Sequence, residues 1–467
     1  MPQEKLSIQE IVEVTQGKLI GKKETTFLLP PQKISTDTRK LKKGDLFIAL
    51  EGKRFDGHRF VEKASEEGAC GAIISEPIPL PSSHFFFIQV KDTLFALQEI
   101  ARHHQKKLSL PLIGITGSNG KTTVKEMAWQ ILSSEYTTLK SEGNFNNQIG
   151  VPLSLLKLHS YHKLGVLEMG MNSKGEIHRL AEIIQPTVGV ITNIQHSHIG
   201  FLGSLAQIME AKAELIGSLN KEERNWLVLN SDDSRTPELQ KRAKCRIITF
   251  GVKNQARVRA EEIAYEDGGL NFILVYRKKR MPISIPIPGL YNVYNALAAS
   301  AISLILNVSL HTIARSLECF KLPPMHSEIS FLGSYQLIDD SYNANPESVN
   351  GALELLQSIG KHRKIVILGD MLELGKMARS LHDKVGRRAG ELGIDALFTL
   401  GEFSKDVSKG ARMAGLKDVF PFRDKERLIA KLLPYLEEGD SLLVKGSRGM
   451  KMEEIVKRLK EKLCFTI

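Results

Sequence analysis

The segment GSNGKTT at residues 117–123 constrains the fold of this chain more than any other. A strand-like run, LIGIT at 112–116, precedes it, and apolar residues recur at helical spacing after it. A strand, a glycine-bearing turn and a helix in this order form a phosphate-binding loop, whose backbone N–H groups surround the anion. Lys121 would reach the β- and γ-phosphates, and a threonine hydroxyl would reach Mg²⁺. The spacing departs from the standard P-loop, because Ile115 stands where its first glycine would be.

Strand-like segments alternate with helical patterns along the rest of the chain, which predicts an α/β fold with mainly parallel sheets. A length of 467 residues corresponds to about three domains. We place them at 1–108, a smaller α/β domain, at 109–322, a P-loop ATPase-like domain, and at 323–467, a second doubly wound domain. In open α/β sheets, ligands bind at the carboxyl ends of the strands, so we look for functional residues there.

The composition fits a soluble globular protein, with 42% hydrophobic and 25% charged residues. The net charge of +11 suits a nucleotide ligand, and the basic residues are too dispersed for a nucleic-acid surface. Four distant cysteines argue against a disulfide framework, and the N-terminus lacks the apolar core of a signal peptide, so we expect a cytoplasmic protein. The uncharged stretch 281–310 holds three prolines and several asparagines, which favours a buried helix over a membrane span.

Two strand ends carry candidate metal ligands. Glu168 ends a buried strand in the run GVLEM at 165–169, where a carboxylate is costly unless it binds a metal or sits in an ion pair of the core. His196 and His198 follow the strand-like run VGVITNI. Either histidine alone would be interpreted as a surface residue, and their spacing does not choose between them.

Three further polar strings stand at turns or strand ends. The loop NFNNQIG at 144–150, with Asn144 and Asn147, is either a plain turn or a polar cradle for a sugar or peptide. The string DDSYNANP at 339–346 and the string KGSRG at 445–449 favour ligand or anion sites over bare loops. Their candidate residues are Asp340, Asn343, Asn345, Lys445 and Arg448.

Together these strings resemble the Mur ligase family of ATP-dependent amide-bond ligases, over nearly the whole chain. The matching strings include DTR at 37–39, GDLFIALEGKRFDGHRF at 44–60, GITGSNGKTT at 114–123, EGNFNNQIGVPLSLL at 142–156 and LEMGMN at 167–172. YNANP, LGDMLELG and KGSRGMKME favour the branch that adds D-alanyl-D-alanine to UDP-N-acetylmuramoyl-tripeptide, and sibling enzymes generally carry a histidine near the position of Asn345.

The resemblance implies a UDP-binding N-terminal domain, a central ATPase domain and a Rossmann-like C-terminal domain that brings the amine. It implies that the tripeptide carboxylate attacks the γ-phosphate of ATP, and that D-alanyl-D-alanine attacks the acyl phosphate, in peptidoglycan precursor synthesis. ATP and Mg²⁺ are the expected cofactors. We expect a monomer with no nucleic-acid partner and no stable membrane insertion.

The resemblance also implies roles for single residues. The metal would be held by Thr122, Glu168 and His198, the histidine that matches when the chain is aligned from residues 192–194. The residues implied in catalysis are Lys121, Glu168, His198 and Lys212, the last as a carbamylated lysine. Nucleotide binding is implied for Gly117, Ser118, Asn119, Gly120, Lys121, Thr122, Thr123, Asn292, Asn295 and Asp340. Substrate binding is implied for Asp37, Arg39, Asn144, Asn147, Asn343, Asn345, Lys445 and Arg448.

Two positions depart from the family pattern. Tyr291 stands where the family often has histidine, and His326 stands where it usually has an arginine that helps to bind nucleotide phosphate. Histidine is only partly charged near neutral pH and forms no bidentate pair. Either another cation substitutes, or ATP binding is weaker and depends on pH.

Two other functions stay open on the sequence alone. One is a sibling amide ligase, either the tripeptide-forming Mur ligase or a folylpolyglutamate synthetase. The other is a P-loop switch or a nucleic-acid-dependent NTPase, suggested by the positive charge. The DDSYNANP and KGSRG strings have no evident role in the second of these.

Overall fold

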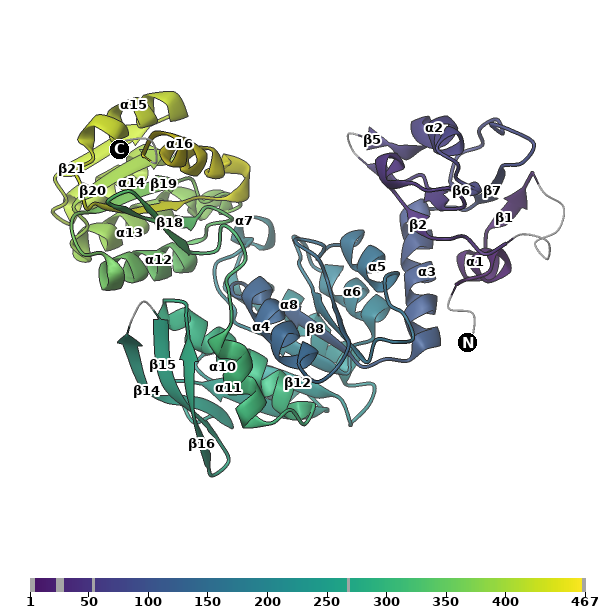
Figure 1. The fold of residues 1–467 in the computed structure, drawn as a ribbon, viewed down its shortest axis with the longest axis horizontal. Coiled ribbons are helices and arrows are strands. Elements are labelled where there is room, and N and C mark those ends of the chain that lie inside the picture. The colour runs from purple at the N-terminus through teal and green to yellow at the C-terminus, as the bar shows by residue number, and fades with distance from the viewer. Residues whose placement is uncertain (1–4, 22–28, 53–54, 267–268, 464–467) are drawn as a thin grey trace.

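Three α/β units follow one another along the chain in the computed structural model, which describes residues 5–21, 29–52, 55–266 and 269–463 (Figure 1). Their sheets have five, nine and six described strands. The N-terminal and C-terminal units lie at opposite ends of the central unit in Figure 1. The predicted α/β class with mainly parallel sheets is confirmed. Cys464 lies outside the described residues.

The N-terminal sheet has the order β1-β7-β6-β3-β2, parallel except for the β1–β7 pair. Its strands are β1 (Lys18–Ile20), β2 (Ile34–Ser35), β3 (Leu46–Ile48), β6 (Gly71–Ile74) and β7 (Phe86–Gln89). A separate hairpin joins β4 (Glu51–Gly52) to β5 (Phe55–Asp56). The helices are α1 (Ile8–Thr15), α2 (Val61–Glu66) and α3 (Thr93–Leu108). The long α3 leads into the central unit and packs against its helices α5 and α6 (Figure 1).

The central sheet has the order β16-β15-β14-β13-β12-β11-β8-β10-β9. Its parallel strands are β8 (Leu112–Thr116), β9 (Thr138–Lys140), β10 (Leu164–Glu168), β11 (Val188–Ile191), β12 (Trp226–Asn230), β13 (Arg246–Gly251) and β14 (Val258–Glu266). An antiparallel extension adds β15 (Gly269–Tyr276) and β16 (Lys279–Ile285). This extension was not predicted from the sequence.

The helices of the central unit cover both faces of its sheet. They are α4 (Lys121–Ser133), α5 (Gly150–Leu155), α6 (Glu176–Ile184), α7 (Ile199–Leu202), α8 (Leu205–Leu219), α9 (Thr236–Arg242), α10 (Leu290–Ile305) and α11 (Leu310–Glu318). The uncharged stretch forms β16 and the buried α10, which packs against α4 as predicted for a core helix. None of the described helices has the length and hydrophobicity that a bilayer span requires.

The C-terminal sheet has the order β17-β18-β22-β19-β20-β21, and only the β17–β18 pair is antiparallel. Its strands are β17 (Glu328–Leu332), β18 (Tyr335–Asp340), β19 (Lys364–Gly369), β20 (Ala396–Leu400), β21 (Asp418–Phe422) and β22 (Ser441–Lys445). The α-helices are α12 (Pro346–Ile359), α13 (Ala378–Glu391), α14 (Ser404–Met413), α15 (Lys425–Tyr435) and α16 (Glu453–Leu463). The domain boundaries at 108/109 and 322/323 fall between elements and stay predictions.

Strand register brings the candidate residues together. Glu168 of β10 pairs with Ile115 of β8, and Thr116 of β8 pairs with Ile191 of β11. The loops that follow these three strands therefore meet at one edge of the central sheet. In the C-terminal sheet, Asp340 of β18 pairs with Lys445 of β22, so the DDSYNANP and KGSRG strings are neighbours.

Candidate active site

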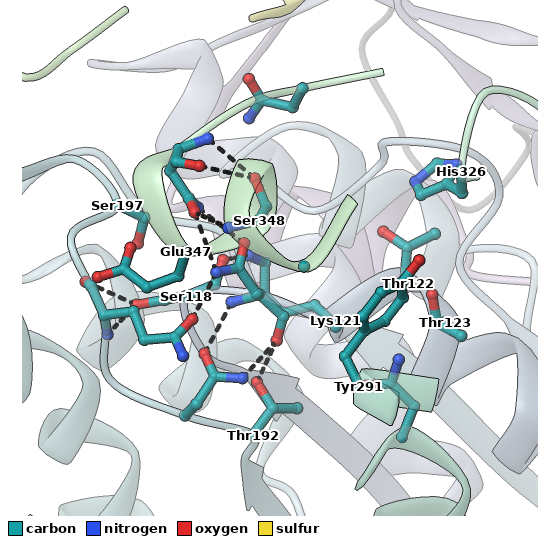
Figure 2. Close-up of a pocket in the computed structure, with 18 of the residues that line it drawn as sticks. Ser118, Lys121, Thr122, Thr123, Thr192, Ser197, Tyr291, His326, Glu347 and Ser348 are labelled. Carbon is teal, nitrogen blue, oxygen red and sulfur yellow. Dashed lines mark hydrogen bonds between the residues drawn. The ribbon is translucent and has the colours of Figure 1, made fainter. Parts of the chain in front are cut away.

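A cavity of about 1300 Å³ lies between the central and C-terminal units. The central unit contributes the phosphate loop, the loops after β10 and β11, and the start of α10. The C-terminal unit contributes residues around the start of α12, the loop after β19 and the KGSRG segment. Figure 2 shows Ser118, Lys121 and Thr122 of the central unit on the same cavity as Glu347 and Ser348 of α12.

Two glycines shape the phosphate loop. Gly117 and Gly120 have φ angles of 147° and 82°, a conformation that glycine adopts without steric cost. A Cβ atom at Gly117 would overlap the Thr192 side chain, and one at Gly120 would overlap Asn295 Oδ1. The loop therefore packs directly on Thr192, which follows β11, and on α10. Helix α4 begins at Lys121, so its N-terminus faces the loop interior.

Lys121 folds its side chain into the phosphate loop. Its Nζ donates to the carbonyl oxygens of Gly117 at 2.9 Å and Ser118 at 3.3 Å. Burial lowers the pKa of Lys121, and the negative charge of Glu168 acts in the opposite direction. The loop thus holds a cation within reach of any phosphate that it binds.

Glu168 is buried, with 3% of its surface exposed, and its two hydrogen-bond partners are neutral. Oε2 accepts from Thr122 Oγ1 at 2.8 Å, and Oε1 accepts from Asn146 Nδ2 at 2.8 Å. The alternative of a paired core carboxylate does not describe this arrangement, since no cation hydrogen-bonds to Glu168 among the described residues. Asn146 was not predicted as a site residue, although it stands in the same loop as the predicted Asn144 and Asn147.

The donor set around Glu168 fits Mg²⁺ held jointly by the protein and a phosphate. The Glu168 carboxylate and the Thr122 hydroxyl are oxygen ligands, which Mg²⁺ prefers. Across the described ranges, no group of three His, Cys, Asp or Glu side chains is placed to hold a metal unaided. Mg²⁺ is ordinarily bound by one or two carboxylates together with waters and substrate phosphates, and this site offers such a set.

Both candidate histidines line the cavity, and each meets a glutamate of the C-terminal unit. His196 Nδ1 contacts Glu347 Oε1 at the start of α12. His198 Nδ1 lies 2.6 Å from Glu373 Oε2, in the loop after β19. Neither glutamate was predicted as a site residue, although Glu373 lies in the LGDMLELG string and Glu347 directly follows DDSYNANP.

The asparagines of α10 lie at the other side of the phosphate loop. Asn292 Nδ2 donates to Pro288 O at 2.6 Å, and Asn295 Nδ2 donates to Asn292 Oδ1 at 3.0 Å. The hydroxyl of Tyr291, the first departure from the family pattern, lies 2.8 Å from Ser327 Oγ. Burial raises the pKa of Tyr291, and the nearby Asp340 carboxylate raises it further.

The two polar strings of the C-terminal unit form one cluster. Lys445 Nζ bonds to Asp340 Oδ2 at 2.5 Å and to the carbonyl oxygen of Asn343 at 2.9 Å. The Asn343 side chain in turn accepts a long bond of 3.4 Å from the Arg448 backbone N–H. Both cations are paired, Lys445 with Asp340 and Arg448 with Glu453 at 3.2 Å, but Lys445 is buried and Arg448 is exposed, so Arg448 is the more accessible cation of the cluster.

His326, the second departure, stacks on a ring at the cavity wall. Its imidazole lies 4.4 Å from the Tyr342 ring, at an interplanar angle of 27°. The guanidinium of Arg448 lies 5.9 Å from the same ring. An arginine therefore stands close to the position where His326 replaces one.

Lys212 on α8 has 1% of its surface exposed. It donates no hydrogen bond to any described residue, and it does not line the cavity. Burial lowers the pKa of Lys212 well below its ordinary value, and the positive charge of Lys121 lowers it further. The side chain is thus biased towards a neutral amine, the condition that carbamate formation needs.

Most other predicted site residues also line the cavity, with four exceptions besides Lys212. Gly117, the first residue of the phosphate loop, does not line the cavity, and Asn144 is exposed to solvent on the loop before α5. Asp37 and Arg39 form a surface ion pair of 2.9 Å in the N-terminal unit, and neither residue lines this cavity. These two stay predicted substrate contacts of that unit.

Comparisons with known proteins match the whole chain to one family. Three family models match it in order: the Mur ligase family catalytic domain at residues 32–105, the Mur ligase middle domain at 115–303, and the Mur ligase glutamate ligase domain at 329–448. A UDP-N-acetylmuramoyl-tripeptide–D-alanyl-D-alanine ligase from Bacillus subtilis is 37% identical over 460 residues, covering 98% of this chain and 99% of that protein.

Solved structures of MurF ligases are also similar to this chain. A crystal structure of MurF from Acinetobacter baumannii has a TM-score of 0.91 and 33% identity, covering 99% of this chain and 100% of that one. The MurF ligase of Thermotoga maritima in complex with ADP has a TM-score of 0.81 and 25% identity, covering 92% and 97% of the two chains.

Proposed function

This chain belongs to the Mur ligase family, and from that premise we propose how it works as the ligase that joins D-alanyl-D-alanine to UDP-N-acetylmuramoyl-tripeptide in peptidoglycan precursor synthesis. The main support for this site is that Lys121, Thr122 and Glu168 lie together at one edge of the central sheet. They face the C-terminal unit across the cavity. A phosphate loop and an amine-bearing domain on the same cavity suit the two half-reactions of an amide ligase.

The first half-reaction forms an acyl phosphate. An oxygen of the tripeptide carboxylate attacks the γ-phosphorus of ATP, the bond to the β-phosphate oxygen breaks, and ADP leaves. Lys121 would offset the charge that builds on the transferring phosphoryl group, and the N-terminus of α4 would add its dipole. Burial around the loop strengthens both effects, because water screens them less.

The second half-reaction forms the amide. The neutral amine of D-alanyl-D-alanine attacks the carbonyl carbon, the tetrahedral intermediate loses inorganic phosphate, and the nitrogen loses a proton. The cluster of Asn343, Lys445 and Arg448 is suited to hold the dipeptide carboxylate, since it offers cations and an amide at the cavity wall. Asn345, at the start of α12, would orient the dipeptide towards the phosphate loop.

Thr122, Glu168 and His198 are the residues that would hold Mg²⁺ beside the phosphates. When bound, the metal would neutralise charge on the phosphate oxygens. Asn146 would fix the Glu168 carboxylate through its hydrogen bond, so that one carboxylate oxygen keeps a set direction.

The remaining predicted residues complete the proposal. Asn292, Asn295 and Asp340 would contact the adenosine, and Asp37 and Arg39 would contact the UDP moiety on the N-terminal unit. Lys212 would react as a neutral amine with carbon dioxide, forming a carbamate and releasing one proton. We propose that the protein acts as a cytoplasmic monomer.

The test is inorganic phosphate release from ATP with purified UDP-N-acetylmuramoyl-tripeptide, with and without D-alanyl-D-alanine. We expect phosphate release that requires both substrates and Mg²⁺. The product should be heavier than the UDP-N-acetylmuramoyl-tripeptide by one D-alanyl-D-alanine less one water. Release that requires a single amino acid, glutamate on a folate, or DNA or RNA in place of the dipeptide would assign the chain to one of the alternative functions.

A further inference from the structure

Glu373 reaches across the domain interface to His198. It lies in the loop between β19 and the 3₁₀ turn η4 (Gly375–Met377) of the C-terminal unit, and its Oε2 is 2.6 Å from His198 Nδ1. Both side chains line the cavity. Nothing in the proposed mechanism so far uses Glu373.

The backbone holds Glu373 at this contact. Its carbonyl oxygen accepts a 2.7 Å hydrogen bond from Gly200 N, at the start of α7. A Cβ atom at Gly200 would lie 2.6 Å from both Glu373 O and Gly375 N, so only glycine permits this approach. Figure 1 shows α7 beside the C-terminal unit.

The conformation of Glu373 also points to a fixed role. Its φ of 64° lies in the left-handed region. For any residue other than glycine this conformation is unfavourable in free energy, and it persists only where surrounding contacts hold it. His198 on the other side of the contact has a φ of 58°. Two non-glycine residues in this conformation thus meet across one interface.

A carboxylate at one imidazole nitrogen determines what the other nitrogen does. When Nδ1 carries the proton towards a carboxylate, Nε2 keeps its lone pair and the ring plane is fixed. His198 Nδ1 is buried and, despite the short distance, is not aligned for a hydrogen bond.

We propose that Glu373 is a positioning residue, which orients the His198 imidazole when the C-terminal unit docks on α7. The inference rests on the proposed function, because it assumes that His198 acts beside the ATP phosphates. The contact between Glu373 and His198 would make the orientation of the His198 imidazole depend on whether the C-terminal unit is docked. The pair of His196 and Glu347 offers a matched control, since it joins the same two units through the same side-chain types.

The first test reads the histidine ring directly, without substrate or metal. Ring ¹⁵N shifts of labelled, ligand-free protein are measured at a pH at which those shifts themselves show neutral imidazole, and they report which ring nitrogen carries the proton. We expect one dominant His198 tautomer, protonated at Nδ1, in the wild type and a mixture of tautomers in Glu373→Ala. Glu347→Ala should leave the His198 signals unchanged. Unchanged His198 signals in Glu373→Ala would overturn the proposal.

The second test uses phosphate release by the substrate-saturated enzyme. We expect Glu373→Ala to lower kcat by about 10- to 100-fold, as loss of a group that orients a ligand does, with little change in KM for the dipeptide. In a His198→Ala background the same change should have almost no further effect, whereas equal losses in both backgrounds would contradict the inference. Glu373→Gln, which preserves size, serves if the alanine variant is unstable. A wild type without dipeptide-dependent release would refute the proposed function and leave the ring measurement intact.

Discussion

Asn119 of the phosphate loop and Asn345 of the C-terminal unit exchange hydrogen bonds across the domain boundary. Asn345 Nδ2 donates to Asn119 Oδ1 at 2.7 Å, and Asn119 Nδ2 donates to Asn345 Oδ1 at 3.2 Å. Asn345 is also the N-cap of α12, where Oδ1 accepts from Ser348 N at 2.9 Å. One side chain therefore starts a helix in one unit and contacts the phosphate loop of the other.

We predict that Asn345→Ala lowers the ligation rate by about tenfold or more and also lowers the free energy of unfolding. Loss of an N-cap costs about 1 kcal/mol of unfolding free energy, and loss of the bridge frees the phosphate loop. Ser348→Ala is the control, because it removes the Ser348 hydroxyl from the capping box but keeps the Asn119 contact. Urea unfolding and phosphate release separate the two effects. Equal loss of activity in both variants would show that only the cap matters.

Lys121→Ala should reduce turnover below about a tenth of the wild-type rate while leaving the unfolding transition in place. Lys121 lies inside the phosphate loop, and losing such a charge costs a few kcal/mol of transition-state stabilisation. Lys157→Ala, which breaks only a surface ion pair with Glu142, should turn over like the wild type. Retained activity in Lys121→Ala would mean that the loop does not bind the transferring phosphate.

His198→Ala should raise the Mg²⁺ concentration needed for half-maximal activity more than His196→Ala does. Only His198 belongs to the set that would share the metal with Thr122 and Glu168. The comparison is balanced, since each variant also loses one contact to a glutamate of the C-terminal unit. A larger rise for His196→Ala would reverse the assignment.

Much of the fold followed from hydrophobic patterning. The run LIGIT became β8 with the predicted bounds, and the run VGVITNI contains β11. These strands are buried and read as continuous apolar runs, which is the clearest strand signal in a parallel sheet. The antiparallel extension of β15 and β16 was not predicted, because a strand's own residues carry little information on which strand it pairs with.

The site was predictable only within each unit. Glu168 was predicted as a strand-end carboxylate, and β10 places it there. Asn146, Glu347 and Glu373 were missed as site residues, because their roles arise from contacts with other loops or another unit, which no spacing along the chain encodes. The burial of Lys212 belongs to the same class, because only the packing of α8 shows that this lysine faces inwards.

We predict that Lys212→Ala loses most of its activity and regains part of it with added acetate. A carbamate on Lys212 would be a carboxylate-like anion, and acetate can supply a similar group. Because the pKa of Lys212 is lowered, the neutral amine, and hence the carbamate, should form at lower pH than for a solvent-exposed lysine. Protein incubated with ¹³C-bicarbonate should show one carbamate signal that the variant lacks. Wild-type activity in the variant would leave Lys212 as a packing residue.

His326→Arg should lower KM for ATP, by about tenfold if the new guanidinium makes one charged hydrogen bond to phosphate worth about 1.5 kcal/mol. The wall position is suitable, because His326 already stacks on Tyr342 and arginine stacks on aromatic rings equally well. His326→Gln is the control, with a polar but uncharged side chain, and should leave KM for ATP near the wild-type value. Arg448 already stands 5.9 Å from the Tyr342 ring, so a second arginine could instead repel it. An unchanged or higher KM in His326→Arg, with a raised KM in Arg448→Ala, would mean that Arg448 already supplies the cation that His326 lacks.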